Sequence, residues 1–157
     1  MTPDVERSLA VQLYNKTWTL IEKPDRTQDE DDEMLHCAHA SRYHWGEIGT
    51  AANRARGEWQ CSRVYAILGR TEPALHHARR CLELVESFPD DMEEFDLPAA
   101  YEALARASSV PATSTKHVVT PSSGAGPAPV SPTRTTAFTS RQTLHRFLRG
   151  RDIRRPR

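Results

Sequence analysis

The chain has 157 residues, equal numbers of basic and acidic side chains (21 of each) and a mean hydropathy of −0.65. This length suits one domain, and the low hydropathy indicates that part of the chain does not join a folded core. No apolar run approaches the roughly 20 residues that span a bilayer, and "MTPDVERSLA" lacks the regions of a signal peptide. Three cysteines without metal-site or redox spacing fit a reducing compartment, so we expect a cytoplasmic protein with no membrane span.

The neutral total conceals two parts of opposite charge. Residues 1–110 hold 12 Lys and Arg against 20 Asp and Glu, a net charge of −8. Residues 111–157 hold 9 Lys and Arg against one acid, a net charge of +8. We therefore divide the chain into an acidic domain, 1–110, and a basic tail, 111–157.

The first half of the domain predicts three helices. Apolar residues at near-helical spacing indicate an amphipathic helix over 4–22, which the proline of "KPDRT" ends. Thr27 and Glu30 have the spacing of a capping box, so a second helix is expected over about 28–46. Thr50 is expected to cap a third helix, over about 51–68.

The stretch "YAILGRTEPALHHARRCLEL" predicts a helical hairpin. Gly69 permits the left-handed turn that ends a helix, and Thr71 is expected to cap the fourth helix. A fifth helix is expected over about 97–109, with Asp96 as its cap and with Leu97, Tyr101 and Leu104 as its apolar positions. With no strand-like alternation of useful length, the predicted fold class is all-α.

The hairpin resembles a tetratricopeptide repeat. With Ala55 as the first of 34 positions, a small residue, Ser62, an aromatic residue, Tyr65, and the turn glycine, Gly69, stand at matching places, and "ALHHARRCL" supplies the small residues of the second helix. Two places depart from the motif, since Glu58 stands where tryptophan is usual and Glu86 stands where the terminal proline is usual. "SRYHWGEIGTAANRARGEWQCSRVYAILGR" also resembles uncharacterised bacterial repeat-like proteins. The resemblance implies a short right-handed stack of antiparallel hairpins.

The same resemblance implies a partner-binding groove on the third helix. Arg56, Trp59, Arg63 and Ala66 share one stripe of that helix, at positions that line the concave face of the repeat family. Two arginines beside an indole suit an acidic peptide, through forked hydrogen bonds and apolar contact. The alternative is that the arginines pair with acids of the domain and that Trp59 packs against the first or fifth helix.

Helix two carries a weaker candidate for chemistry. Asp32, His36 and His39 lie on one side of the helix, where they could hold a metal ion and support a metal-dependent hydrolase. Without the spacing of zinc hydrolases, a solvated or inter-subunit face is the alternative, and we expect no cofactor.

The composition of the basic tail, residues 111–157, predicts no packed structure. Six of the residues in 121–132 are proline or glycine, which is typical of a disordered linker. Its end, "SRQTLHRFLRGRDIRRPR", could contact an acidic partner or, weakly, nucleic acid. An out-of-frame translation is the other interpretation.

The leading hypothesis is therefore a non-catalytic scaffold that binds an acidic protein segment. A metal-binding protein and a structural oligomerisation module, such as a homodimer, are the alternatives.

Overall fold

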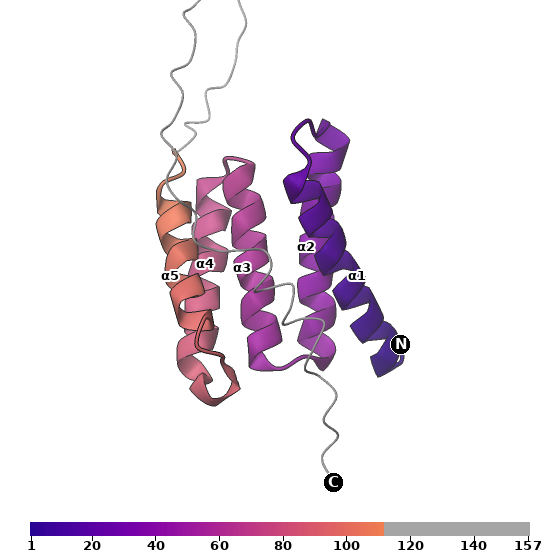
Figure 1. The fold of residues 1–157 in the computed structure, drawn as a ribbon, viewed down its shortest axis with the longest axis vertical. Coiled ribbons are helices and arrows are strands. Elements are labelled where there is room, and N and C mark those ends of the chain that lie inside the picture. The colour runs from indigo at the N-terminus through magenta and orange to yellow at the C-terminus, as the bar shows by residue number, and fades with distance from the viewer. Residues whose placement is uncertain (112–157) are drawn as a thin grey trace, which may run out of the picture. The chain divides into compact units, whose positions relative to one another are not determined.

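The computed structural model of the protein describes residues 1–111, and these residues form a stack of antiparallel α-helices (Figure 1). The five helices and one short 3-10 helix are α1 (Pro3–Glu22), α2 (Gln28–Ile48), α3 (Ala51–Ile67), α4 (Thr71–Ser87), η1 (Pro89–Asp91) and α5 (Asp96–Ser108). No strand occurs in this part of the chain. The predicted all-α class is confirmed. The predicted tail lies outside the described residues except for Pro111.

Local signals in the sequence explain most of the helix ends. Thr27 and Thr50 both form capping boxes, in which each hydroxyl accepts from the N–H three residues later and the side chain of Glu30 or Asn53 accepts in return. Gly69 has a φ of +69°, the left-handed conformation that glycine adopts at low cost. These predictions are confirmed, and they explain why α3 and α4 form a tight hairpin.

Two predicted caps are wrong. Thr71 lies inside α4, and its hydroxyl instead donates to the carbonyl oxygens of Val110 and Pro111, at 3.2 and 3.1 Å. Asp96 is the first residue of α5 and is buried, with its carboxylate turned towards α3. Both side chains therefore join distant parts of the chain instead of capping their own helices.

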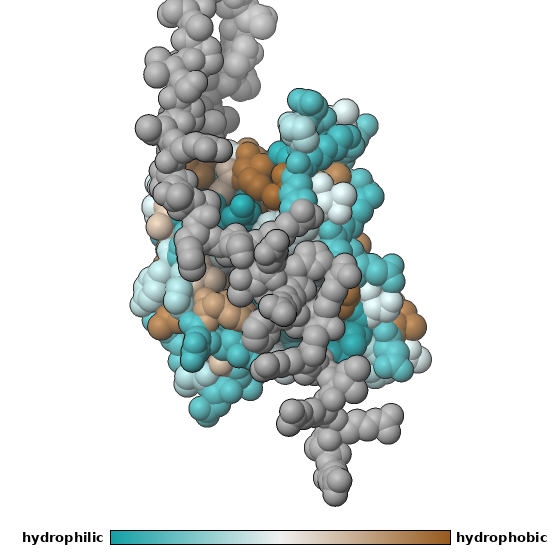
Figure 2. All heavy atoms as spheres, viewed as in Figure 1, coloured by the Kyte–Doolittle hydropathy of each residue, from teal (hydrophilic) through white to brown (hydrophobic). Residues whose placement is uncertain are grey.

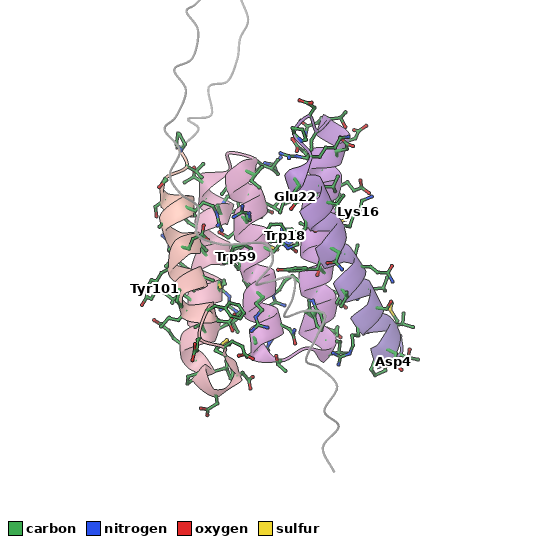
Figure 3. The ribbon with its side chains drawn as sticks, viewed as in Figure 1. Asp4, Lys16, Trp18, Glu22, Trp59 and Tyr101 are labelled. Carbon is green, nitrogen blue, oxygen red and sulfur yellow. The ribbon has the colours of Figure 1, made fainter. Side chains whose placement is uncertain are left out.

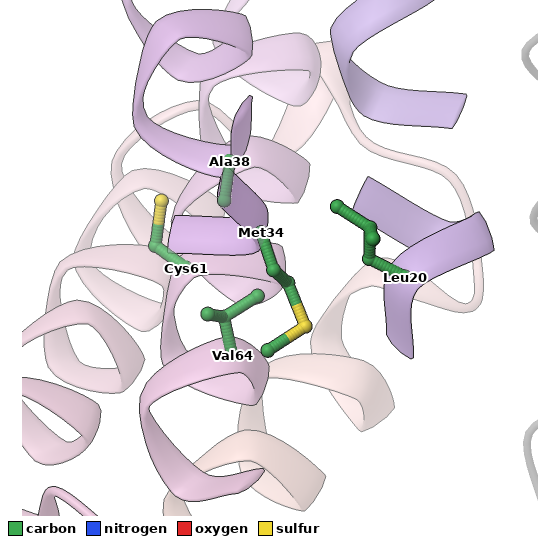
Figure 4. Packing of buried hydrophobic residues seen from close by; sticks show 5 residues of the cluster. All are labelled: Leu20, Met34, Ala38, Cys61 and Val64. Atoms are coloured by element: carbon green, nitrogen blue, oxygen red, sulfur yellow. The ribbon is translucent and has the colours of Figure 1, made fainter. Parts of the chain in front are cut away.

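The first hairpin packs on the second through a compact apolar core. Figure 4 shows the buried cluster at this junction, to which α1 contributes Leu20, α2 contributes Met34 and Ala38, and α3 contributes Cys61 and Val64. The buried residues of α2 lie on one face at helical spacing, and they are Met34, Cys37, Ala38, Ser41 and Trp45. Burial of such side chains is the main favourable contribution to folding, at about 25 cal/mol per Å².

Small side chains bring α4 and α5 together. Ala100, Ala103 and Ala107 form the fully buried face of α5, and small residues allow close approach of paired helices. The predicted apolar positions Leu97 and Tyr101 are instead 43% and 53% exposed, so that prediction is wrong for these two residues.

The surface of the described residues is mainly hydrophilic on the face shown in Figure 2, with separate apolar areas. None of the helices in residues 1–111 combines the length and apolar character needed to cross a bilayer.

Candidate functional site

The stripe predicted on α3 faces α1 and α5, which lie on the same side of the stack as α3. In Figure 1 α3 lies between α1 and α5, and Figure 3 shows Trp18 of α1 and Trp59 of α3 directed towards one another. We use the name arginine–indole cluster for five residues of these helices. They are Trp18, Trp59, Arg63, Glu102 and Arg106.

Trp59 is buried at the centre of this cluster, with 2% of its surface exposed. Its ring centroid lies 5.9 Å from that of Trp18, and its indole Nε1 donates to Oε2 of Glu102 at 3.1 Å. Trp59 is therefore not displayed on the surface. The alternative expected it to pack against the first or the fifth helix, and it contacts both.

Arg56 also serves the fold. Its Nε and one terminal nitrogen donate to the two carboxylate oxygens of Asp96, at 2.9 and 2.8 Å, and its Cζ lies 4.9 Å from the ring centroid of Phe95. This forked pair joins α3 to α5 in a setting where the Asp96 side chain is 3% exposed. Geometry of this kind makes an Arg–carboxylate pair strong and specific. Arg56 thus makes an internal contact, which agrees with the alternative that the arginines pair with acids of the domain.

Arg63 differs from Arg56 because no carboxylate of residues 1–111 lies within ion-pair distance of it. Its Cζ lies 5.4 Å from the ring centroid of Trp18 and 5.5 Å from that of Trp59, so the guanidinium packs over both indoles. Its Nε is a buried donor without an acceptor. Ala66, the last residue of the predicted stripe, is half-buried near the end of α3.

Arg106 of α5 adds a second cation to the cluster. It packs over Trp59, with Cζ 5.1 Å from the ring centroid, and donates to the carboxylate of Glu102. Two of its nitrogens, Nε and Nη2, are buried, and residues 1–111 provide no acceptor for them. Burial lowers the pKa of Arg106, the charge of Glu102 opposes this effect, and the charge of Arg63 adds to it. Among the described residues Glu102 pairs with Arg106, and Arg63 adds a second positive charge nearby.

A second polar cluster lies where α2, α3 and α4 meet, and we call it the histidine seam. It consists of His39, Arg42, Glu58, Tyr65 and His77. Nε2 of His39 is 3.0 Å from the hydroxyl of Tyr65, and Nδ1 of His77 donates to Glu58 at 2.6 Å. Nε of Arg42 donates to the other oxygen of Glu58 at 2.9 Å. The carboxylate of Glu58 therefore receives hydrogen bonds from α2 and from α4.

The charge states of the seam follow from these contacts. Burial alone would raise the pKa of Glu58, but the hydrogen bond from His77 and the charge of Arg42 outweigh burial and lower that pKa. Burial lowers the pKa of His39, and the charge of His77 lowers it further. At neutral pH the seam therefore holds an ionised Glu58 and a neutral His39.

The structure does not assemble the metal site that was considered for α2. Asp32 and His36 are exposed, whereas His39 is half-buried and turned to Tyr65. Within residues 1–111 no three potential ligands are grouped so that they could hold a metal ion. The expectation of a solvated face is wrong for His39, because α3 and α4 cover it.

The cysteines are suited to packing and not to nucleophilic chemistry. All three are buried and free. Burial raises the pKa of the Cys37 and Cys61 thiols and raises that of Cys81 to about 12, so each is protonated at neutral pH.

Comparison with known proteins identifies no relative, since no protein-family model, curated protein or solved structure matches the chain.

Sequence reasoning missed the members of both clusters that lie outside the predicted stripe. Glu102 and Arg106 were not considered as partners of Trp59, and His77 was not considered as a partner of Glu58. One signal was present, because Glu58 stands at a repeat position where a large apolar residue is usual. A charged residue at such a position predicts buried partners of opposite charge.

Proposed function

We propose that the protein is a non-catalytic binding module, a cytoplasmic scaffold of tetratricopeptide-like hairpins that captures an acidic protein segment. Its binding surface is the side of the stack formed by α1, α3 and α5. Arg63 and Arg106 recognise carboxylates. The indoles of Trp18 and Trp59 pack against the guanidinium groups and fix their positions.

The observation that supports this proposal is the guanidinium of Arg63, which packs over two indoles without a carboxylate partner among the described residues. A half-buried cation with a buried, unpaired donor is an unfavourable arrangement in the free protein, and a ligand carboxylate would relieve it. Arg106 adds two more unpaired donors. Charge-assisted hydrogen bonds to these donors would be strong.

The indoles contribute preorganisation in this scheme. A guanidinium over an aromatic ring gains about 0.5–1 kcal/mol at an exposed site and more when water is excluded. Arg63 contacts two rings, so its rotamer is already restricted before a ligand arrives. Less side-chain entropy is then lost on binding. An affinity in the micromolar range, Kd about 1–100 µM, is expected for one such anchor.

The test is selection of peptides by the full chain from a displayed library of random 12-residue peptides. Enriched peptides are expected to carry at least two Asp or Glu residues. The tightest peptide is then measured by fluorescence anisotropy against the wild-type chain and Arg63→Glu. The charge reversal is expected to weaken binding at least tenfold while the circular dichroism spectrum stays helical.

Arg79→Glu is the matched control. Arg79 is exposed on α4, so it changes the net charge equally without touching the cluster. Binding by Arg63→Glu and Arg79→Glu that is weakened to the same degree would show a non-specific effect of charge. Enrichment of peptides without acidic residues would reject the proposal directly.

A further inference from the structure

The histidine seam joins the two helical hairpins of the stack. His39 and Arg42 belong to α2 in the first hairpin, whereas Glu58, Tyr65 and His77 belong to α3 and α4 in the second. The rings of His39 and His77 are 5.2 Å apart between centroids, at an interplanar angle of 66°. The ring of His77 also stacks on that of Tyr65, with centroids 5.5 Å apart and an interplanar angle of 9°. The two imidazoles thus meet across the hairpin junction.

The seam contains one carboxylate and can contain three cations. Glu58 already accepts from Arg42 and His77. His39 contacts no carboxylate that the seam provides, and its Nε2 is directed at the neutral hydroxyl of Tyr65. A proton on His39 would place a positive charge against the His77 ring, with Glu58 compensating only one of the neighbouring charges. Like charges at this distance repel in a partly desolvated setting.

We propose that the seam is a pH-sensitive joint, in which protonation of His39 opposes the contact between the two hairpins and so alters the arginine–indole cluster on the other side of α3. The connection between the two sites is α3 itself. It supplies Glu58 and Tyr65 to the seam, and it supplies Trp59 and Arg63 to the cluster. Trp18, which contacts Trp59, belongs to the first hairpin. The contact between the two indoles therefore reports the relation between the hairpins.

The other charged and titratable groups that face the seam do not supply a second carboxylate to His39. On α2 the charge of the exposed His36 acts on His39 and opposes its protonation. On α4 His76 touches His77, with ring centroids 5.1 Å apart. Three groups act on Tyr65: Cys61 of α3, Arg70 at the start of α4, and the exposed Glu72 of α4. Glu58 is the group that favours a proton on His39, and burial and His77 act more strongly against it.

The direction of the pH effect follows from linkage. The pKa of His39 is lowered in the folded chain, so the unfolded chain takes up this proton first as the pH falls. The free energy of unfolding is unaffected above the ordinary histidine pKa of about 6.5. It decreases as the pH falls from there to the lowered pKa of the folded chain. One proton excluded from the folded state multiplies the unfolding equilibrium constant by up to tenfold per pH unit in this window.

The experiment is a pH titration of the full chain between pH 7.5 and 5, with tryptophan emission and urea unfolding as readouts. Wild-type emission is expected to change with a midpoint below 6.5. His39→Gln keeps a hydrogen-bonding side chain next to Tyr65 but cannot take up a proton. As the pH falls, its unfolding equilibrium constant is expected to rise less than that of wild type, by up to tenfold per pH unit. In His36→Gln, the matched control on the same helix, the pH-dependent change should persist, with a midpoint equal to that of wild type or slightly higher because His36 no longer opposes a proton on His39.

A comparison of variants and one further measurement keep the test decisive. The ionisable groups outside the seam are the same in wild type and in His39→Gln, so the difference between the two proteins isolates His39. If His39→Gln does not fold, NMR titration of the His39 ring in the wild-type chain replaces it. A ring that titrates at or above 6.5, or identical pH profiles for wild type and His39→Gln, would overturn the inference. Neither readout uses a peptide ligand, so their failure is separate from failure of the proposed function.

Discussion

Replacement of Asp96 by alanine tests whether Arg56 belongs to the fold or to a binding surface. The carboxylate of Asp96 accepts two hydrogen bonds from Arg56, at 2.9 and 2.8 Å, and one from the backbone N–H of Glu93, at 2.9 Å. The side chains of Asp96 and Arg56 are 3% and 13% exposed. The alanine variant therefore removes three hydrogen bonds and leaves a guanidinium largely buried without its carboxylate.

The expected loss of unfolding free energy is about 3 kcal/mol. Breaking a buried ion pair by removal of one partner costs about 3–5 kcal/mol, because the remaining charge is uncompensated. We take the lower end because Arg56 retains its contact with the Phe95 ring and some access to water. Replacement of both partners by apolar residues, Arg56→Met with Asp96→Leu, leaves no unpaired charge. The double variant is expected within about 1 kcal/mol of wild type.

Urea unfolding at pH 7, followed by circular dichroism, measures this cycle in the full chain. Asp90→Ala is the matched control, because Asp90 is an exposed acid of η1, and its loss should cost under about 0.5 kcal/mol. A loss of unfolding free energy below about 1 kcal/mol for Asp96→Ala would refute the reasoning. It would also be refuted if the losses of Arg56→Met alone and Asp96→Leu alone simply added in the double variant. Arg56 would then be available to a ligand, as the sequence suggested.

Three further predictions concern stability, and each is measured by urea or thermal unfolding. Trp59→Ala should lose about 3–5 kcal/mol because it removes a buried indole, and a loss under about 1 kcal/mol would show that the indole is not packed. Gly69→Ala should lose about 1 kcal/mol through backbone strain alone, since no atom lies within 4 Å of the added methyl group. Tyr101→Ser should change the free energy of unfolding by under about 0.5 kcal/mol, because Tyr101 is exposed. Ala103→Phe should lower it by about 1–3 kcal/mol or more by overpacking a buried position. A larger loss for Tyr101→Ser than for Ala103→Phe would mean that α5 is rotated from this orientation.

Helix positions were predictable because short-range chemistry sets them. The hydroxyls of Thr27 and Thr50 bond within three residues, and Gly69 adopts its turn without help from distant parts of the chain. Such signals can be recognised in any sequence. The same logic failed for Thr71 and Asp96, whose side chains have equally good capping chemistry but find stronger partners elsewhere.

Partners that lie far apart in the sequence could not be predicted. Periodicity gives the direction of a side chain around its own helix, but it does not identify the neighbour on that side. The stripe of Arg56, Trp59 and Arg63 was placed on one face correctly. Asp96 and Glu102 of α5 accept hydrogen bonds from this stripe. Those contacts depend on how α5 packs against α3, and the spacing of residues within α3 contains no information about that packing.

The orientation of α5 illustrates a second limit, which is the role of side-chain size. Apolarity alone favoured Leu97 and Tyr101 as the inner face, and the structure buries alanines instead. Close helix packing selects small residues, and a pattern judged by hydrophobicity undervalues them. The α4 face was predictable, since Ala74 and Ala78 stand at helical spacing on one face and also match the small positions of the repeat motif.

The central helix explains why the two clusters are to be treated together. Residues 57–62 of α3 are all buried, because α1 and α5 cover one side of the helix and α2 and α4 cover the others. Glu58 and Trp59 are neighbours in the chain, yet the first contacts α2 and α4 while the second contacts α1 and α5. A hydrogen-bonded helix transmits a displacement along and across itself with little deformation, and packed interfaces on both sides respond to it. A shift of α3 at Glu58 would therefore move Trp59 and Arg63 as well, because all three residues belong to one helix.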